Sequence, residues 1–217
     1  MKHNAALRQG RLVAFEGIEG SGKTSQISKI AEWLRHPPVV TREPGGTPFA
    51  DRVRRILLDP KNSGLSPHLE LLLYEAARRD HCEKVIRPAL HRGKTVLCDR
   101  FTDATIAYQG YGRGLKLDTI KRMNEQATGG IKPDLTILLD LPVSTGLKRS
   151  QRRLKRERLH EGRFEYEALA LHRRVRRGYL ALAHQNKKRF LVVDATGNPD
   201  QTFGRILKKL EGVLWTH

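Results

Sequence analysis

The sequence contains few cysteines and no long apolar run. Two of its 217 residues are cysteines, Cys82 and Cys98, and neither belongs to a Cys/His cluster with the spacing of a zinc site. Two thiols cannot form a disulfide framework, so we expect both to be buried and reduced, in a cytoplasmic protein. No stretch of about 18 apolar residues occurs, and residues 1–11 lack the apolar segment of a signal peptide. We therefore expect no membrane association.

Acidic and aromatic residues are also scarce. The chain has 41 Lys and Arg residues against 23 Asp and Glu, a formal net charge of +18, and aromatic residues make up 6%. A basic surface attracts polyanions such as nucleic acid, but a substrate with several phosphates attracts the same surface. Much of the excess lies in residues 148–163 and 173–177, without the interleaved aromatic residues that stack on single-stranded bases. We therefore expect no nucleic-acid binding.

One complete motif stands near the start of the chain. It consists of Gly17, Ile18, Glu19, Gly20, Ser21, Gly22, Lys23 and Thr24, which fit G-x-x-x-x-G-K-[S/T]. An apolar run precedes it and a helical pattern follows, which is the strand–loop–helix context that the motif requires. The N–H groups of such a loop surround a β-phosphate. Lys23 can reach the β- and γ-phosphates and Thr24 can hold Mg²⁺, so the motif predicts a site for a nucleoside triphosphate.

The apolar pattern predicts an α/β fold. Short strands are predicted over residues 11–16, 39–41, 95–98, 135–140 and 190–194. Helices are predicted over 26–34, 48–58, 66–91, 102–108, 118–127, 142–151, 165–185 and 199–214, and residues 110–114 as a flexible glycine-rich loop. Strands that alternate with helices indicate a five-stranded, mostly parallel sheet with helices on both faces, in a single domain over residues 1–217. Ligands bind at the carboxyl ends of such strands.

Charged residues follow the second and third predicted strands. Asp99 ends the third strand, where a carboxylate beside a glycine loop can hold Mg²⁺ through water; a helix cap or an ion pair to Arg100 is the alternative. Arg42 and Arg100 are placed to bind a monophosphate acceptor, because a guanidinium matches phosphate oxygens in a bidentate way. Each arginine alone is equally compatible with a surface ion pair.

Three residues of the long predicted helix share one face. Tyr74, Arg78 and His81 recur at the spacing i, i+4 and i+7. An aromatic ring and a guanidinium on one stripe can stack on a nucleobase and donate hydrogen bonds to it. Aromatic residues at helical spacing more often belong to a core, so both interpretations stay open.

Several segments together resemble bacterial thymidylate kinases. They are residues 15–24, the sequence TREPGGT at 41–47, Asp99-Arg100-Phe101, and AYQGYGRG at 107–114, and the similarity continues at 133–140, 146–149 and 194–196. The resemblance spans nearly the whole chain in order. It implies a nucleoside-monophosphate-kinase-like fold with a P-loop, transfer of the γ-phosphoryl group of ATP to thymidine monophosphate (dTMP), and a homodimer.

The resemblance also implies roles for individual residues. Lys23, Glu19, Arg100 and Arg153 would be catalytic, and Arg149 would lie beside adenine. Glu19, Arg42 and Arg100 would meet the acceptor, Tyr74 would stack on thymine, and Arg78 would donate to a thymine carbonyl. Thr105, Tyr108 and Gln109 would complete the pocket for base and sugar, with Tyr108 near the deoxyribose.

The resemblance further implies a basic lid over residues 150–164. Some members carry an arginine inside the glycine loop, but Gly20 leaves this loop without one, so a lid arginine would supply the charge. Arg152, Arg153 and Arg156 are candidates, and Gly162 replaces the usual acid at the end of the lid. Two alternatives remain. One is a related P-loop kinase that acts on deoxyuridylate, a nucleoside or another acceptor, and the other is a nucleic-acid-binding protein on a vestigial kinase fold.

Overall fold

Five parallel strands form a single sheet in a computed structural model that describes residues 10–157 and 162–210. The spatial order is β2-β3-β1-β4-β5, with the strand before the glycine loop in the centre. The strands are β1 (Leu12–Glu16), β2 (Val39–Arg42), β3 (Val96–Asp99), β4 (Leu135–Asp140) and β5 (Phe190–Asp194). The predicted strands and the α/β class are confirmed, with boundaries that differ by no more than one residue.

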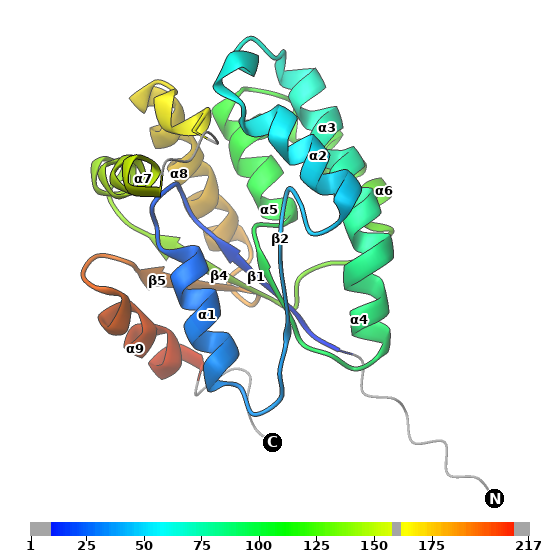
Figure 1. Cartoon of the computed structure of the whole chain (residues 1–217), viewed down its shortest axis with the longest axis vertical. Helices are drawn as coiled ribbons and strands as arrows, with labels where there is room; N and C mark the ends of the chain where they lie inside the picture. The colour runs from blue at the N-terminus through cyan, green and yellow to red at the C-terminus, as the bar shows by residue number, and fades with distance from the viewer. Residues whose placement is uncertain (1–9, 158–161, 211–217) are drawn as a thin grey trace, which may run out of the picture.

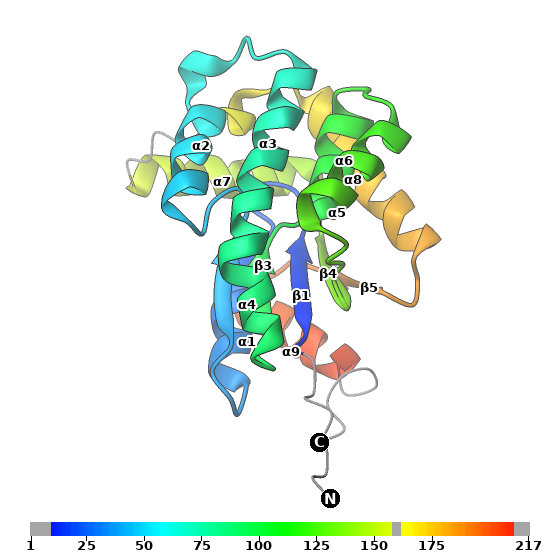
Figure 2. The same ribbon diagram turned by 90° about the vertical axis from the view of Figure 1, so that its right-hand side faces the viewer.

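Both faces of the central strand are covered by helices. Helices α1 (Lys23–Trp33) and α9 (Pro199–Leu210) lie side by side over one face, whereas the helical segment 82–91 and helix α8 (Leu169–Gln185) cover the other (Figures 1 and 2). Successive strand residues point to opposite faces. Accordingly Val13 belongs to the apolar cluster of Ile27 and Ile30, while Leu12 belongs to that of Cys82 and Ile86. Burial on both sides explains the continuous apolar pattern of β1.

The long helix predicted over residues 66–91 is continuous but not regular. It consists of α3 (Pro67–His81), a π-helical stretch η2 (Cys82–Ile86) and α4 (Arg87–His91). Ser66 caps its start, because the side chain accepts a hydrogen bond from the Leu69 N–H. The preceding helix α2 (Pro48–Leu58) begins in the same way, with Thr47 accepting from Ala50, and η1 (Pro60–Asn62) connects the two.

The prediction of a flexible glycine-rich loop over residues 110–114 is wrong for most of that segment. Helix α5 (Thr102–Thr105) continues without interruption as the π-helical η3 (Ile106–Gly112). The glycines there allow close packing: a Cβ on Gly110 would lie 2.5 Å from Leu117 Cδ2, and one on Gly112 would lie 3.0 Å from Val175 Cγ2. Helix α6 (Leu117–Thr128) follows as predicted.

The basic segment after β4 is more helical than predicted. Helix α7 (Val143–Glu157) passes the predicted end at residue 151, because Ser150 and Leu154 keep a buried stripe at helical spacing while the charges face outward. The helix predicted from residue 165 starts later, as α8 (Leu169–Gln185), after the short η4 (Phe164–Tyr166). Residues 158–161 of the predicted lid and 211–214 of the last predicted helix lie outside the described residues. Within residues 10–157 and 162–210, no helix is long and apolar enough to cross a membrane.

Candidate active site

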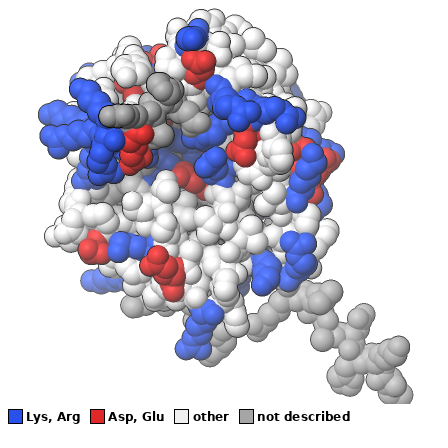
Figure 3. Space-filling view, viewed as in Figure 1, with Lys and Arg blue, Asp and Glu red and all other residues white. Residues whose placement is uncertain are grey.

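A cleft of about 620 Å³ opens at the carboxyl ends of β1, β2 and β3. The glycine loop forms one side of it, and α3 with the α5–η3 segment forms the other. Lys and Arg side chains gather around this hollow and at the upper left of the same view, where α7 lies (Figure 3). The cleft therefore brings together segments from the first three quarters of the chain.

The glycine loop holds Lys23 in its interior. Gly17, Gly20 and Gly22 adopt φ angles of 142°, 70° and 91°, which favour glycine. Lys23 Nζ donates to the carbonyl oxygens of Gly17 and Ile18 at 3.2 and 3.3 Å. Burial and the nearby Arg100 lower the pKa of Lys23 to about 8. An anionic ligand in the loop would favour the charged ammonium and raise this pKa again.

The two residues predicted for Mg²⁺ are in contact. Thr24 Oγ1 donates a hydrogen bond to Asp99 Oδ2 at 3.0 Å. Asp99 does not cap the next helix, since Phe101 occupies the N-cap position of α5. In the described part of the chain, no group of three or more His, Cys, Asp or Glu residues could hold a metal ion. A hydroxyl and a carboxylate are hard ligands that fit Mg²⁺ when phosphate oxygens and water supply the remaining positions.

Arg100 is not an exposed ion pair but the centre of a partly buried cluster. Its guanidinium donates to Glu19 Oε1 at 2.9 Å, to the Gly17 carbonyl at 3.0 Å and to the Tyr108 hydroxyl at 3.1 Å. Tyr108 in turn donates to Glu19 Oε1 at 2.5 Å. Burial would raise the pKa of Glu19, but His172, Arg100 and Tyr108 outweigh it and hold this pKa well below its usual range. Glu19 is therefore a fixed carboxylate of the glycine loop at the wall of the cleft.

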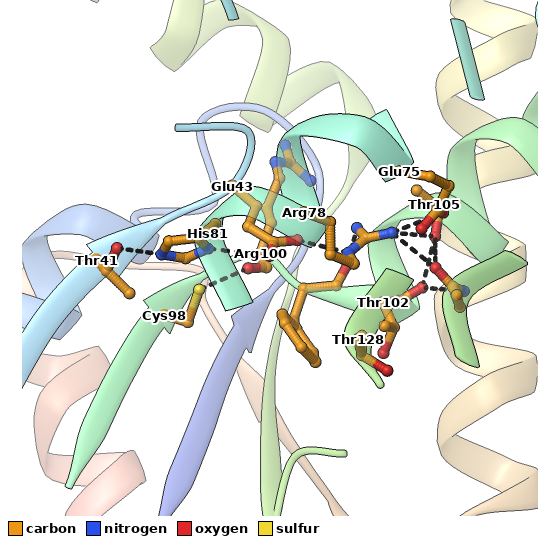
Figure 4. Close-up of polar contacts among 12 residues, drawn as sticks. Thr41, Glu43, Glu75, Arg78, His81, Cys98, Arg100, Thr102, Thr105 and Thr128 are labelled. Carbon is orange, nitrogen blue, oxygen red and sulfur yellow. Dashed lines mark hydrogen bonds and ion pairs between the residues drawn. The ribbon is translucent and has the colours of Figure 1, made fainter. Parts of the chain in front are cut away.

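Arg78 lies at the opposite side of the cleft and is 2% exposed. Its Nε donates to Glu43 at 2.8 Å, its Nη1 to Glu75 and to Asn124 at 2.7 Å each, and its Nη2 to the Phe101 carbonyl at 3.3 Å (Figure 4). Within the described residues, these bonds use four of the five N–H groups of the guanidinium. The fifth, on Nη2, has no acceptor within the described residues.

The three residues predicted to share one face of the long helix do not have the same role. Tyr74 and Arg78 line the cleft, together with Thr105, Tyr108 and Gln109. His81 is fully buried and does not belong to the wall. One nitrogen of its ring lies 2.6 Å from Thr41 Oγ1 and the other 3.1 Å from Glu43 Oε1 (Figure 4). His81 therefore supports the TREPGGT loop and does not meet a base.

Two further predicted arginines, Arg42 and Arg149, differ in their relation to the cleft. Arg42 is exposed at the wall of the cleft and forms a weak ion pair with Asp51, at 3.4 Å. Arg149 lies outside the cleft wall and donates to the carbonyl oxygens of Ala195 and Gly197 at 3.0 and 2.8 Å. Arg149 thus fastens the loop after β5 to helix α7.

Of the three arginines considered for the lid, Arg153 reaches the wall of the cleft. Arg152 and Arg156 are exposed on α7, and Arg156 pairs with its neighbour Glu157 at 2.7 Å. The glycine loop itself has no room for a larger side chain at Gly20, because a Cβ there would lie 2.0 Å from the Gly146 carbonyl oxygen of α7. The loop and α7 are in backbone contact at this point.

Comparisons with known proteins point to one family. The family model described as thymidylate kinase matches residues 15–206. The thymidylate kinase of Syntrophotalea carbinolica is 54% identical over 198 residues, which cover 89% of this chain and 92% of that protein. That of Desulfosudis oleivorans is 49% identical over 206 residues, which cover 93% and 96%. The crystal structure of thymidylate kinase from Ehrlichia chaffeensis matches with a TM-score of 0.75 and 33% identity, covering 93% of this chain and 99% of that one.

The chain belongs to the thymidylate kinase family. The resemblance inferred from its motifs is thereby confirmed, as are the P-loop nucleoside monophosphate kinase fold and the class of ATP-dependent phosphotransferase. The alternatives of a different acceptor and of a nucleic-acid-binding protein gain no support from these relatives.

Three buried residues of this thymidylate kinase family member were missed by sequence reasoning. Glu43 belongs to the TREPGGT motif and binds Arg78, so the motif itself was the available signal. Asn124 is 5% exposed on α6, and its spacing of four residues from the buried Ile120 and Thr128 was the signal. His172 is fully buried 3.2 Å from Glu19 Oε2, and no local pattern marks it.

The end of the basic segment is anchored and not free to meet a phosphate. Arg163 is 2% exposed, and it donates to the Leu57 carbonyl and to Glu70 Oε2 at 2.5 Å each. Its guanidinium lies 4.5 Å from the centre of the Phe164 ring, which packs edge-on against Tyr108 at 5.4 Å. Arg163 therefore joins the segment after residues 158–161 to α2, α3 and the cleft.

Proposed function

We propose that the protein transfers the γ-phosphoryl group of ATP to dTMP and yields ADP and thymidine diphosphate. The observation that carries this proposal is the single cleft in which a triphosphate loop faces a pocket with an aromatic ring and a buried arginine. Phosphoryl transfer needs both phosphates held in line and their charge neutralised, which this arrangement can supply.

On the donor side, Lys23 exchanges its two carbonyl partners for the β- and γ-phosphates of ATP. The ammonium is already at the loop, so binding requires little movement. The loop N–H groups of residues 17–24 surround the β-phosphate. Arg149, which holds the loop after β5, borders the position of adenine.

Mg²⁺ accompanies the triphosphate in this proposal. Thr24 would bind the ion directly and Asp99 through water, and the 3.0 Å contact between them supports this assignment. When bound, the ion supplies neutralisation of phosphate charge.

On the acceptor side, Arg42 and Arg100 bind the monophosphate. Arg100 is held in place by Glu19 and Tyr108, so its guanidinium is oriented before the substrate arrives. Arg153 from α7 meets the transferring phosphate, and residues 150–164 act as the lid that carries it. The backbone contact at Gly20 supports a role for an arginine of α7, because it excludes an arginine side chain at position 20 of the loop.

The base occupies the pocket opposite the glycine loop. Tyr74 stacks on thymine, Thr105 and Gln109 border it, and Tyr108 lies near the deoxyribose. The remaining N–H of Arg78 donates to the 4-carbonyl oxygen of thymine. Cytosine carries an amino group at this position, which cannot accept that hydrogen bond, so the site selects against it.

A panel of acceptors tests the proposal. The purified protein is assayed with ATP and Mg²⁺ for ADP formation with dTMP, deoxyuridine, deoxycytidine and deoxyguanosine monophosphates, and thymidine. We expect the highest kcat/KM with dTMP. A higher kcat/KM with any other monophosphate, or with thymidine, would show that dTMP is not the preferred acceptor and would contradict the proposal.

We further propose that the protein is a cytoplasmic homodimer. Large apolar side chains are exposed on α2 and α3, namely Phe49, Ile56, Leu69 and Leu72, and a second copy can cover them. Both cysteines are buried and free, which suits a reducing compartment. Light scattering on the purified protein should give twice the mass of the chain, and the mass of one chain would contradict the dimer.

A further inference from the structure

Asn124 lies behind two residues of the proposed base pocket without belonging to the wall of the cleft. Its Oδ1 accepts hydrogen bonds from Arg78 Nη1 at 2.7 Å and from Thr105 Oγ1 at 2.9 Å. Its Nδ2 donates to the Thr102 carbonyl at 3.3 Å. One side chain from α6 thus connects α3, which carries the arginine, to α5, which carries the threonines.

We propose that Asn124 is a positioning residue that sets the orientation of the Arg78 guanidinium and thereby the selection of a pyrimidine with a 4-carbonyl group. The inference rests on the proposed role of Arg78 as a donor to the base. A guanidinium is planar and rigid, so partners on Nε and Nη1 fix the direction of the remaining Nη2 donor. Glu43 binds Nε on one side, while Glu75 and Asn124 accept from Nη1 at 2.7 Å each on the other, with Thr105 Oγ1 more distant at 3.4 Å (Figure 4 labels the two acids).

A neutral acceptor suits this position better than a third acid. Arg78 already meets the two buried carboxylates Glu43 and Glu75. Burial raises the pKa of Glu75, and the neighbouring Glu43 adds to this effect although Arg78 opposes it. A further carboxylate would increase the repulsion, whereas the Asn124 amide supplies an acceptor without charge.

The amide orientation of Asn124 is also determined by its surroundings. The Thr102 carbonyl can only accept, so it requires the Nδ2 side. Arg78 can only donate, so it requires the Oδ1 side. Because the positions of Oδ1 and Nδ2 are both determined by these partners, Asn124 holds Arg78 and Thr105 at a fixed separation.

Two substrates isolate the contact that Arg78 makes. dTMP and 5-methyl-deoxycytidine monophosphate share the methyl group, sugar and phosphate, and differ in the 4-substituent and the N3 proton of the base. An oriented N–H donor on Arg78 can bind the 4-carbonyl oxygen of dTMP, but it cannot bind the 4-amino group of 5-methyl-deoxycytidine monophosphate. The ratio of kcat/KM for the two therefore reports on the orientation of Arg78, and a general loss of structure does not change it.

The test compares Asn124→Leu, which keeps the size but removes the acceptor, with Asn124→Ser, which leaves room for water. We expect kcat/KM for dTMP to fall about 10-fold, mainly through KM, the size of effect that one lost buried hydrogen bond produces. The KM for ATP should stay within about 2-fold, and the preference for dTMP over 5-methyl-deoxycytidine monophosphate should fall by the same 10-fold. Gln126→Leu, on the exposed side of α6, is the matched control and should change neither value.

Other results overturn the inference. If kcat/KM falls equally with both substrates, Asn124 has a structural role and does not set selectivity. If kcat/KM is unchanged in both variants, Asn124 does not position Arg78. If Asn124→Leu does not fold, Asn124→Ser decides alone. If the unmodified protein prefers dTMP to other acceptors but not to 5-methyl-deoxycytidine monophosphate, the proposed role of Arg78 fails while the proposed reaction stands.

Discussion

The two sides of the cleft are built in different ways. The proposed phosphate side is made by one continuous segment, residues 17–24, which is rich in glycine and presents backbone N–H groups. The base side is made by α3, α5 and α6, whose side chains meet in a buried network around Arg78. The first depends on local backbone geometry, and the second depends on packing between distant segments. Changes on the two sides should therefore differ in how far they affect activity, selectivity and stability.

The largest expected effect is on the phosphate side. Lys23→Ala removes the charge that neutralises the transferring phosphates, and turnover should fall at least about 1,000-fold, or several kcal/mol of transition-state stabilisation. The variant should fold as well as the parent, because Lys23 binds loop carbonyls and the Ser21 hydroxyl and no other group within residues 10–157 and 162–210. Steady-state turnover and thermal unfolding check this. Lys29→Ala, on the same helix but paired with Asp200, is the control, and near-normal turnover of Lys23→Ala would remove the loop lysine from the mechanism.

On the base side, Arg78→Ala should damage stability as well as selectivity. Removing the guanidinium leaves Glu43 and Glu75 buried without their partner, which costs about 3–5 kcal/mol of unfolding free energy. The use of dTMP should fall far more than the affinity for ATP, because the donor to the base is lost. Denaturant unfolding and separate KM values measure the two effects. Unchanged stability, or equal losses for dTMP and ATP, would contradict the comparison between the two sides.

The arginines of α7 should differ among themselves. Arg153→Ala should lower kcat about 100-fold, because Arg153 alone of the three candidates lines the cleft. Arg152→Ala and Arg156→Ala have matched chemistry on the same helix and should stay within about 3-fold. Parallel kcat measurements on the three variants, at saturating ATP and dTMP, show which arginine contributes most to turnover. A larger loss in either of the other two variants would assign the phosphate contact to that arginine.

The smallest expected effect on activity is at Glu16, at the end of β1 below the loop, where the change concerns stability. Burial, reinforced by Asp103, raises the pKa of Glu16 to about 7. The folded protein thus keeps the proton of Glu16 to higher pH than the unfolded chain does, so this group makes folding less favourable as pH rises from about 4.5 to 7. The variant Glu16→Gln does not titrate, so it should not show this decrease in stability with rising pH. Its melting temperature relative to the unmodified protein should be higher at pH 8 than at pH 5, and a difference that does not change with pH would contradict the assignment.

The features that sequence analysis predicted well are mostly local. The strands follow from short apolar runs, and the glycine loop, the Thr24–Asp99 pair and the cleft position of Arg100 follow from motifs at strand ends. The extent of α7 was underestimated, because a dense charge run was taken to end a helix although Ser150 and Leu154 continue its buried face. The glycines at 110 and 112 were taken as flexible, but neighbours from α6 and α8 make them necessary for packing.

The base side shows why the rest was not predictable. Asn124 and Arg78 are 46 residues apart, and their hydrogen bond depends on how α6 packs against α3. Glu43 and Arg78 are 35 residues apart and meet through the strand–loop arrangement after β2. A single sequence contains no local signal for such contacts. It predicted Tyr74 and Arg78 as one stripe but not that His81 in the same stripe would serve as a support.

A bisubstrate inhibitor tests the central claim most directly, since the claim is that one cleft holds both substrates for direct transfer. Adenosine and thymidine joined through a chain of five phosphates would span the glycine loop and the base pocket together. The account predicts that this compound binds once per chain and is competitive against both ATP and dTMP. Competition with ATP alone, and an unchanged apparent KM for dTMP, would contradict it.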